Sequence, residues 1–239
     1  RVCGFSAPLV VQSLPMIDNH SHYNAVLWDM DGTILDSHDH HWLAWNEFGR
    51  RNGLPITYAV FNETFGRRND MILRRVAGDD LADGEIERLS EAKEAIYREI
   101  VRSEGVVMLP GVEEWLSAVQ AMGWRQAIAS SAPPQNIVVV LQTLGIANFF
   151  DATVSGADVV HGKPDPEVYL RAAERVAAPP VCCVVMEDAP AGSEGVRRAR
   201  MRCIGVGPVY ESLPADITVR SLDRLAPDAL VRLVSCDPA

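Results

Sequence analysis

Short apolar runs alternate with helical segments along most of this 239-residue chain, and this alternation constrains the fold more than any other feature. Runs of this kind are typical of buried strands in a parallel sheet. They lie at residues 25–28, 126–129, 152–154, 181–186 and 203–206, and helices are expected at residues 112–122, 135–144, 166–176 and 190–201. The pattern predicts an α/β fold with a doubly wound, Rossmann-like parallel sheet.

One long segment interrupts the alternation. Between the first and second runs there is only helical periodicity, with Trp42, Trp45 and Phe48 along one apolar stripe. An insert at this point lies over the carboxyl ends of the strands, where open α/β sheets bind ligands. We therefore expect an N-terminal extension at residues 1–23, a core at residues 24–37 and 105–239, and an all-helical cap at residues 38–104.

The charge balance limits the partners. The chain has 32 acidic and 22 basic residues, and its net charge of -10 argues against nucleic acid, because binding phosphates requires a surplus of basic residues. The mildly apolar residues 5–15 are too few to span a membrane. Five cysteines are an odd number, and Cys182 and Cys183 are typical of buried residues rather than of a disulfide framework. We expect a cytoplasmic monomer or small homo-oligomer.

Two aspartates follow the first apolar run. Asp29 and Asp31 end an extended segment, and a turn through Gly32 can aim both carboxylates at the same small volume. Two acids in one place require a counter-charge, and Mg²⁺ binds through a few carboxylates together with phosphate oxygens of a substrate. Asp-x-Asp-Gly alone also fits a simple turn, so the other strand ends decide between the two interpretations.

Later strand ends carry the remaining reactive groups. Ser130 follows the second run, Lys163 precedes a predicted helix, and Glu187 and Asp188 follow the fourth run. Each group alone also fits a helix cap, a surface charge or a loop. Together they supply a nucleophile, an acid/base, a phosphate clamp and metal ligands, which is what phosphoryl transfer requires. Lys163 is one of only two lysines, which indicates a specific need for a compact positive charge.

These segments resemble the four ordered motifs of the haloacid dehalogenase superfamily of phosphotransferases. The likeness extends from about residue 24 to about residue 207, and the helical insert resembles the cap of the subgroup that contains β-phosphoglucomutase and many small-metabolite phosphatases. The segments that carry it are Asp29-Met30-Asp31-Gly32-Thr33, Ser130, Gly162-Lys163-Pro164-Asp165-Pro166 and Glu187-Asp188.

The resemblance implies a role for each group. Asp29 attacks phosphorus and forms an aspartyl phosphate, and Asp31 first protonates the leaving oxygen and then takes a proton from water. Ser130 and Lys163 hold the phosphoryl oxygens. The second aspartate argues against dehalogenation, which needs no leaving-group acid. The implied ligands of Mg²⁺ are Asp29, the backbone carbonyl of Asp31, and Asp188, with Glu187 nearby as a second acid.

Substrate choice is expected to depend on the cap. By the resemblance, the hinge residue His41 assists Asp31 or contacts a sugar. The cap loop departs from the spacing of the mutases, since Asn69 falls at the position of their phosphate-binding arginine. Arg98 falls near a basic residue of the mutase cap, although an arginine beside a glutamate is more often a surface charge. The expected substrate-binding residues are His41, Arg67, Arg68, Asn69, Arg98 and Ser131.

The sequence therefore predicts an Mg²⁺-dependent phosphatase that hydrolyses a small phosphorylated metabolite, such as a sugar phosphate. One alternative is a mutase of the β-phosphoglucomutase type, which would have to exclude water. A phosphonate hydrolase would need a cap lysine, and the only candidate, Lys93, lies in what we expect to be an exposed helix. A non-catalytic binding protein with the same fold would leave the full set of reactive residues unexplained.

Overall fold

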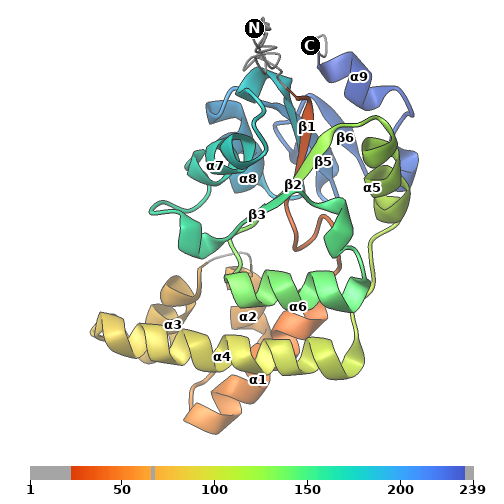
Figure 1. The fold of residues 1–239 in the computed structure, drawn as a ribbon. Helices are drawn as coiled ribbons and strands as arrows, with labels where there is room; N and C mark the ends of the chain where they lie inside the picture. The colour runs from red at the N-terminus through yellow and green to blue at the C-terminus, as the bar shows by residue number, and fades with distance from the viewer. Residues whose placement is uncertain (1–22, 66–67, 235–239) are drawn as a thin grey trace, which may run out of the picture.

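The structure is a computed structural model that describes residues 23–65 and 68–234. In this part of the chain, six parallel strands form one sheet in the order β3-β2-β1-β4-β5-β6 (Figure 1). The strands are β1 (Ala25–Trp28), β2 (Arg125–Ala129), β3 (Ala152–Val154), β4 (Cys183–Glu187), β5 (Arg202–Val206) and β6 (Ile217–Val219). The order runs outwards in both directions from β1 and β4, which confirms the predicted doubly wound fold.

Helices cover both faces of the sheet, and they are α5 (Val112–Ala121), α6 (Pro134–Leu144), α7 (Glu167–Arg175), α8 (Pro190–Arg198) and α9 (Ala229–Leu233). Side chains alternate in direction along a strand. In β1, Val26 and Trp28 join an apolar cluster with α5, α6 and α9, whereas Ala25 and Leu27 join a second cluster with α7 and α8. Figure 1 accordingly shows α5 across the sheet from α7 and α8.

Within residues 38–65 and 68–104, four further helices lie between β1 and α5 and form the helical cap: α1 (His38–Asn52), α2 (Tyr58–Thr64), α3 (Asn69–Ala77) and α4 (Asp83–Glu104). Trp45 and Phe48 of α1 are buried, as their spacing predicted. Figure 1 shows the cap set apart from the sheet, with the core helix α6 beside α4. Because α1 begins shortly after the acids that follow β1, the cap lies over the same end of the sheet as those acids.

The expected elements are present, and their ends differ by a few residues. Strand β4 begins at Cys183 instead of residue 181, because a single 3-10 turn leads into it. Strand β6 was not expected, since its three half-buried residues are too few to show a periodic pattern. The 3-10 helices are η1 (Ala147–Phe149), η2 (Gly156–Asp158), η3 (Pro180–Cys182), η4 (Tyr210–Ser212) and η5 (Leu222–Arg224).

Three expectations drawn from composition and length have different outcomes. Cys182 and Cys183 are buried as expected, and Cys183 and Cys203 are free thiols. Cys182, however, is disulfide-bonded, so the view that it is only a small buried residue is wrong. No helix within the described ranges combines the length and the apolar character needed to cross a membrane. The extension expected at residues 1–23 lies outside the described residues, apart from Tyr23.

Strands β1 and β2 are joined by a buried polar contact. Trp28, the last residue of β1, is fully buried, and its indole Nε1 donates to Oε1 of Gln126 at 3.1 Å. Gln126 in β2 is 1% exposed, and its Nε2 donates to the backbone carbonyl of Leu116 in α5 at 3.0 Å. Both the oxygen and the nitrogen of the glutamine amide are therefore hydrogen-bonded, which is the condition for burying it at a low cost in free energy.

Trp28→Phe is expected to lower the free energy of unfolding by about 2 kcal/mol, because it removes the donor to Gln126 and leaves a gap beneath the sheet. Urea denaturation followed by circular dichroism measures the loss. Val107 is 78% exposed, and Val107→Ala is the control, with an expected change within about 0.5 kcal/mol. Equal stabilities for the two variants would contradict this account of the strand pair.

Candidate active site

A lysine and two acids from distant parts of the chain meet at the carboxyl end of the central strands. Asp29 follows β1, and its backbone N–H donates to the carbonyl of Met186 in β4 at 3.0 Å. Lys163 Nζ lies 2.5 Å from Asp29 Oδ1 and 2.8 Å from Glu187 Oε2. Since these three side chains are almost fully buried, the lysine is held between two carboxylates with little water around it.

A third acid completes a site that can hold a cation. Asp29, Glu187 and Asp188 each offer a carboxylate oxygen, and these oxygens lie within 4.8 Å of one another. Gly32 makes this approach possible, because a Cβ at that position would lie 2.0 Å from Asp188 Oδ2 and its φ is +82°. Carboxylate oxygens this close together are the kind of donor that a hard divalent cation prefers.

The charge of this cluster is only partly balanced. Burial, with the nearby charge of Glu187, raises the pKa of Asp29 to about 7. Burial, with the charges of Asp29 and Glu187, raises the pKa of Asp188 to about 8. Although burial acts in the opposite direction on Lys163, the two carboxylates raise the pKa of Lys163 well above its usual value. The cluster therefore holds more acid than one lysine neutralises, which favours the binding of a cation.

Tyr169 of α7 is a member of the site that the sequence analysis missed. Its hydroxyl donates to Glu187 Oε2 at 2.6 Å, and Lys163 Nζ lies 5.2 Å from the centre of its ring. The other oxygen of Glu187 accepts from the backbone N–H of Ala189 at 3.2 Å. Both oxygens of Glu187 are therefore engaged by the protein, so this acid fixes Lys163 in place. Tyr169 falls within the helix expected at residues 166–176, and that pattern alone gave no sign of a role in the site.

Asp31 lies under a histidine of the cap. His41 of α1 places Nε2 3.6 Å from Asp31 Oδ1, and its Nδ1 is 2.9 Å from Lys93 Nζ. Burial and the charge of Lys93 lower the pKa of His41. A neutral ring that accepts from Lys93 at Nδ1 carries its hydrogen on Nε2, towards Asp31. Although burial acts in the opposite direction, His41 lowers the pKa of Asp31.

Asp31 Oδ1 is buried and, within the described residues, makes no hydrogen bond shorter than 3.5 Å, since His41 Nε2 is 3.6 Å away. A buried oxygen without a close hydrogen bond is costly in a folded protein. Asp31 follows Asp29 by two residues, so this oxygen lies at the same end of the sheet as the lysine cluster. The position suits a group that exchanges a proton with a bound ligand.

Lys93 lies where the sequence analysis did not expect it. We expected an exposed helix, but Lys93 is only 1% exposed. Its Nζ lies 2.9 Å from Glu94 Oε1 and 5.2 Å from the centre of the Trp45 ring. The signal was available, because Lys93 is four residues from both Leu89 and Tyr97 and so falls on the buried face of α4.

The other expected cap residues that the structure describes make contacts with the cap and the core instead of with the acids around Lys163. Arg68 has an exposed side chain paired with Asp70, and its Cδ lies 3.6 Å from where a Cβ of Gly162 would be. Asn69 donates from Nδ2 to Glu94 Oε1 at 2.7 Å. Arg98 is not a surface charge, since its side chain is 9% exposed. Arg67 lies outside the described residues.

Ser130 and Ser131 lie at the end of β2, the strand beside β1. Ser130 is 2% exposed and donates its backbone N–H to the carbonyl of Val154 at 3.0 Å. Its Oγ accepts from the backbone N–H of Ala132 at 3.1 Å. Ser131 is exposed in the loop that leads to α6. Both serines are thus at the predicted edge of the sheet, one strand away from Asp29.

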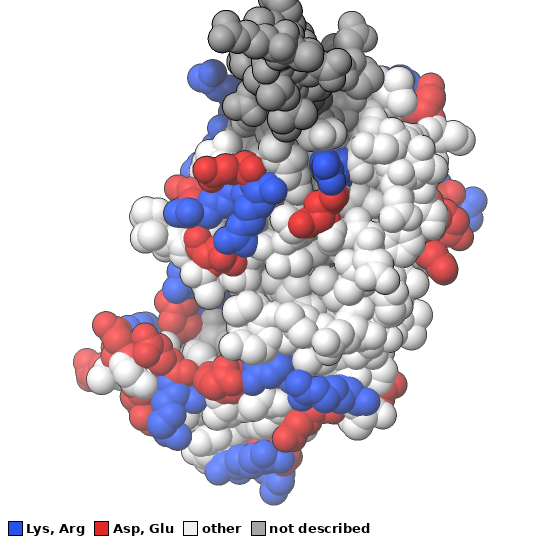
Figure 2. All heavy atoms as spheres, in the orientation of Figure 1, with Lys and Arg blue, Asp and Glu red and all other residues white. Residues whose placement is uncertain are grey.

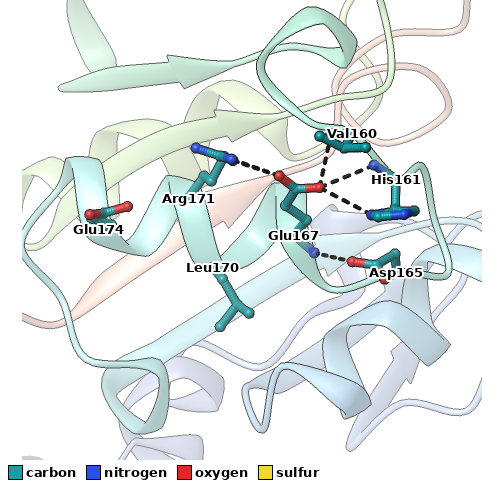
Figure 3. A pocket seen from close by; sticks show the side chains of 7 residues that line it. All are labelled: Val160, His161, Asp165, Glu167, Leu170, Arg171 and Glu174. Atoms are coloured by element: carbon teal, nitrogen blue, oxygen red, sulfur yellow. Dashed lines mark hydrogen bonds and ion pairs between the residues drawn. The ribbon is translucent and has the colours of Figure 1, made fainter.

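A surface pocket beside the start of α7 is distinct from this site (Figure 3). At its centre Glu167 accepts hydrogen bonds from the backbone N–H groups of Val160 and His161 and from Arg171. The carboxylate is therefore already satisfied by the protein. The pocket is lined by Val160, His161, Asp165, Glu167, Leu170, Arg171 and Glu174, and it includes none of the acids around Lys163.

A buried carboxylate beside a fixed lysine, a second aspartate two residues later and a convergent acid set, all under a helical cap, define a class of phosphate-transfer enzymes. The chain belongs to the haloacid dehalogenase-like hydrolases, whose family model matches residues 23–200. The family resemblance stated from the motifs is thereby confirmed.

Named relatives agree with this assignment. Protein CbbY from Rhodobacter capsulatus is 32% identical over 75% of this chain and 83% of its own length. Validoxylamine A 7'-phosphate phosphatase from Streptomyces hygroscopicus subsp. limoneus is 30% identical over 84% of this chain and 94% of its own. A crystal structure of β-phosphoglucomutase from Clostridium difficile has a TM-score of 0.77 at 27% identity, and the match covers 88% of this chain and 96% of that one. The family model and the named phosphatases among the relatives make the chain a phosphoric monoester hydrolase.

The raised pKa values of Asp29 and Asp188 predict how stability changes with pH. An acid whose pKa rises on folding keeps a proton that the unfolded chain releases, so the folded state loses stability as pH rises from about 4 to about 8. Without divalent cations, we expect the free energy of unfolding to fall by on the order of 1 to 3 kcal/mol across this window.

Urea denaturation at about pH 5.5 and about pH 8, in the wild type and in Asp188→Asn, measures this effect. The amide has no proton to lose, so the variant is expected to show a smaller fall. Asp29 interacts with Asp188, so its contribution to the fall is expected to change in the variant as well, whereas titrating groups far from this cluster cancel in the comparison. The same fall in both proteins would show that Asp188 is ionised throughout.

Proposed function

We propose that this protein is an Mg²⁺-dependent phosphatase that hydrolyses a sugar phosphate or a related phosphomonoester through an aspartyl phosphate on Asp29. The observation that carries the proposal is the placement of Lys163, which is held between Asp29 and Glu187 beside Asp188. A fixed ammonium and a nucleophilic carboxylate on the same side of a small volume suit a bound phosphoryl group.

Asp29, Asp188 and the backbone carbonyl of Asp31 are the groups we assign to Mg²⁺. When bound, the ion supplies positive charge that screens the carboxylate nucleophile from the phosphate dianion. Glu187 is engaged by Lys163, Tyr169 and Ala189, so we assign it to orienting the lysine. The excess of negative charge among these acids supports a cation in this position.

The two aspartates divide the chemistry. In the first step an oxygen of Asp29 forms a bond to phosphorus, the bond to the leaving oxygen breaks, and Asp31 gives that oxygen its proton. In the second step Asp31 takes a proton from water, which attacks phosphorus and releases Asp29. The low pKa of Asp31 suits the second step. A bound phosphate dianion would raise that pKa by charge repulsion, which suits the first step.

The phosphatase is preferred to the alternatives for two reasons. A relative that aligns over most of both chains is named as a phosphatase, and hydrolysis needs only water after the first transfer. Lys93 is buried, but its Nζ is occupied by Glu94 and His41, so we assign it to holding His41 and not to phosphonate cleavage. Isomerisation of a sugar phosphate is the outcome that would favour the mutase.

Asp29→Asn is expected to reduce hydrolysis of an aryl phosphate by on the order of a thousandfold, because the amide is a poor nucleophile. Removing Mg²⁺ with a chelator is expected to have a comparable effect on the wild type. Phosphate release is measured by a colorimetric assay. Asp39 is exposed, and Asp39→Asn is the control that should retain full activity.

A panel of phosphorylated sugars, with Asp29→Asn as the blank, then identifies the substrate. A coupled assay for conversion of β-glucose 1-phosphate to glucose 6-phosphate is run beside it. Faster isomerisation than phosphate release would replace the phosphatase by a mutase. Full activity in Asp29→Asn would remove Asp29 as the nucleophile and with it the whole mechanism.

A further inference from the structure

A buried carboxylate of the cap is held by an amide of the core. Glu94 of α4 is 4% exposed, and its Oε2 accepts a hydrogen bond from Asn136 Nδ2 of α6 at 2.7 Å. Its Oε1 accepts from Asn69 Nδ2 and from Lys93 Nζ. Although burial acts in the opposite direction, these donors and the charge of Lys93 hold the pKa of Glu94 at about 2. The carboxylate is therefore charged and fully hydrogen-bonded while it is buried.

Asn136 uses both ends of its side chain on the cap. It is 1% exposed, and its Oδ1 accepts from Arg98 Nη1 at 3.1 Å while its Nδ2 donates to Glu94. Arg98 lies one turn after Glu94 on α4, and it also pairs with Glu91. One core amide thus binds an anion and a cation of the same helix, so moving α4 away from α6 would break both contacts together.

These contacts lie between the two reactive parts of the site. Asn136 is in the first turn of α6, directly after the loop that contains Ser130 and Ser131. On the other side, Glu94 binds Lys93, and Lys93 binds His41, which lies beside Asp31. The position of the cap helix is therefore fixed relative to both the serine loop and the acid/base aspartate.

We propose that Asn136, Glu94 and Arg98 form a clasp that holds the cap closed on the core, with Asn136 as the positioning residue on the core side. Breaking the clasp gives up two hydrogen bonds to charged groups, which are stronger than those between neutral groups. The kinetic part of the test below rests on the proposed phosphatase function, whereas the exchange part does not.

The first test is amide hydrogen exchange of the ligand-free protein, followed by mass spectrometry. Asn136→Ala is expected to raise the exchange rate of α4 and α6 by about tenfold, since local stability follows local contacts. Strands β1 and β4 should keep their protection. Gln135 is exposed on the same helical turn, and Gln135→Ala is the matched control that should exchange like the wild type.

A second variant covers the case in which Asn136→Ala destabilises the whole protein. Glu94→Gln keeps the shape of the side chain and removes its charge, so it should loosen α4 and α6 while β1 and β4 stay protected. Unchanged exchange of α4 and α6 in Glu94→Gln, or loss of protection in β1 and β4 equal to that in α4, would overturn the clasp.

The second test is steady-state kinetics with p-nitrophenyl phosphate. If the substrate binds only the closed form, Asn136→Ala raises KM by about tenfold and changes kcat by less than about twofold, because saturating substrate restores closure. A loss of kcat with unchanged KM would overturn this role and indicate an effect on the chemical step. Absence of activity in the wild type would refute the proposed function and leave the exchange result standing.

Discussion

The contact of Lys163 with Asp29 and Glu187 is the interaction on which the rest of the site depends. It joins the end of β1, the loop before α7 and the end of β4 in a place with little water. Charges in such a place interact more strongly than in water, and each must have a partner. The fold supplies those partners from separate strand ends, and the surplus of acid over base is the reason why we place the proposed cation and phosphoryl group here.

The sequence was sufficient to predict that the reactive residues meet at one edge of the sheet, because this follows from one rule of topology. Parallel strands of a doubly wound sheet end at the same edge, so Asp29, Ser130 and Asp188, each just after an apolar run, had to lie near one another. The helical insert was equally clear, since its periodicity differs from that of the strands. Strand β6 was not predicted, because three half-buried residues are too few to show a periodic hydrophobic pattern.

The buried polar contacts within the cap and between the cap and the core could not be predicted in the same way. Lys93, Glu94 and Asn136 are buried only because each finds a partner on another element, and a charged residue in a helical pattern is normally solvent-exposed. For Lys93 the spacing from Leu89 and Tyr97 was a usable signal. For Asn136 there was none, because its partners Glu94 and Arg98 belong to a different part of the chain.

The missing side chain at Gly32 has a consequence for how this site tolerates change. The nearest obstacle to a methyl group there is the carboxylate of Asp188, which can rotate, and not a rigid backbone atom. Apart from the modest cost of the left-handed backbone, an alanine at this position would therefore leave most of the fold intact and turn away an oxygen that we assign to Mg²⁺. A substitution at such a position would lower catalytic activity much more than it lowers the stability of the fold. A protein with this change would therefore be well folded but inactive.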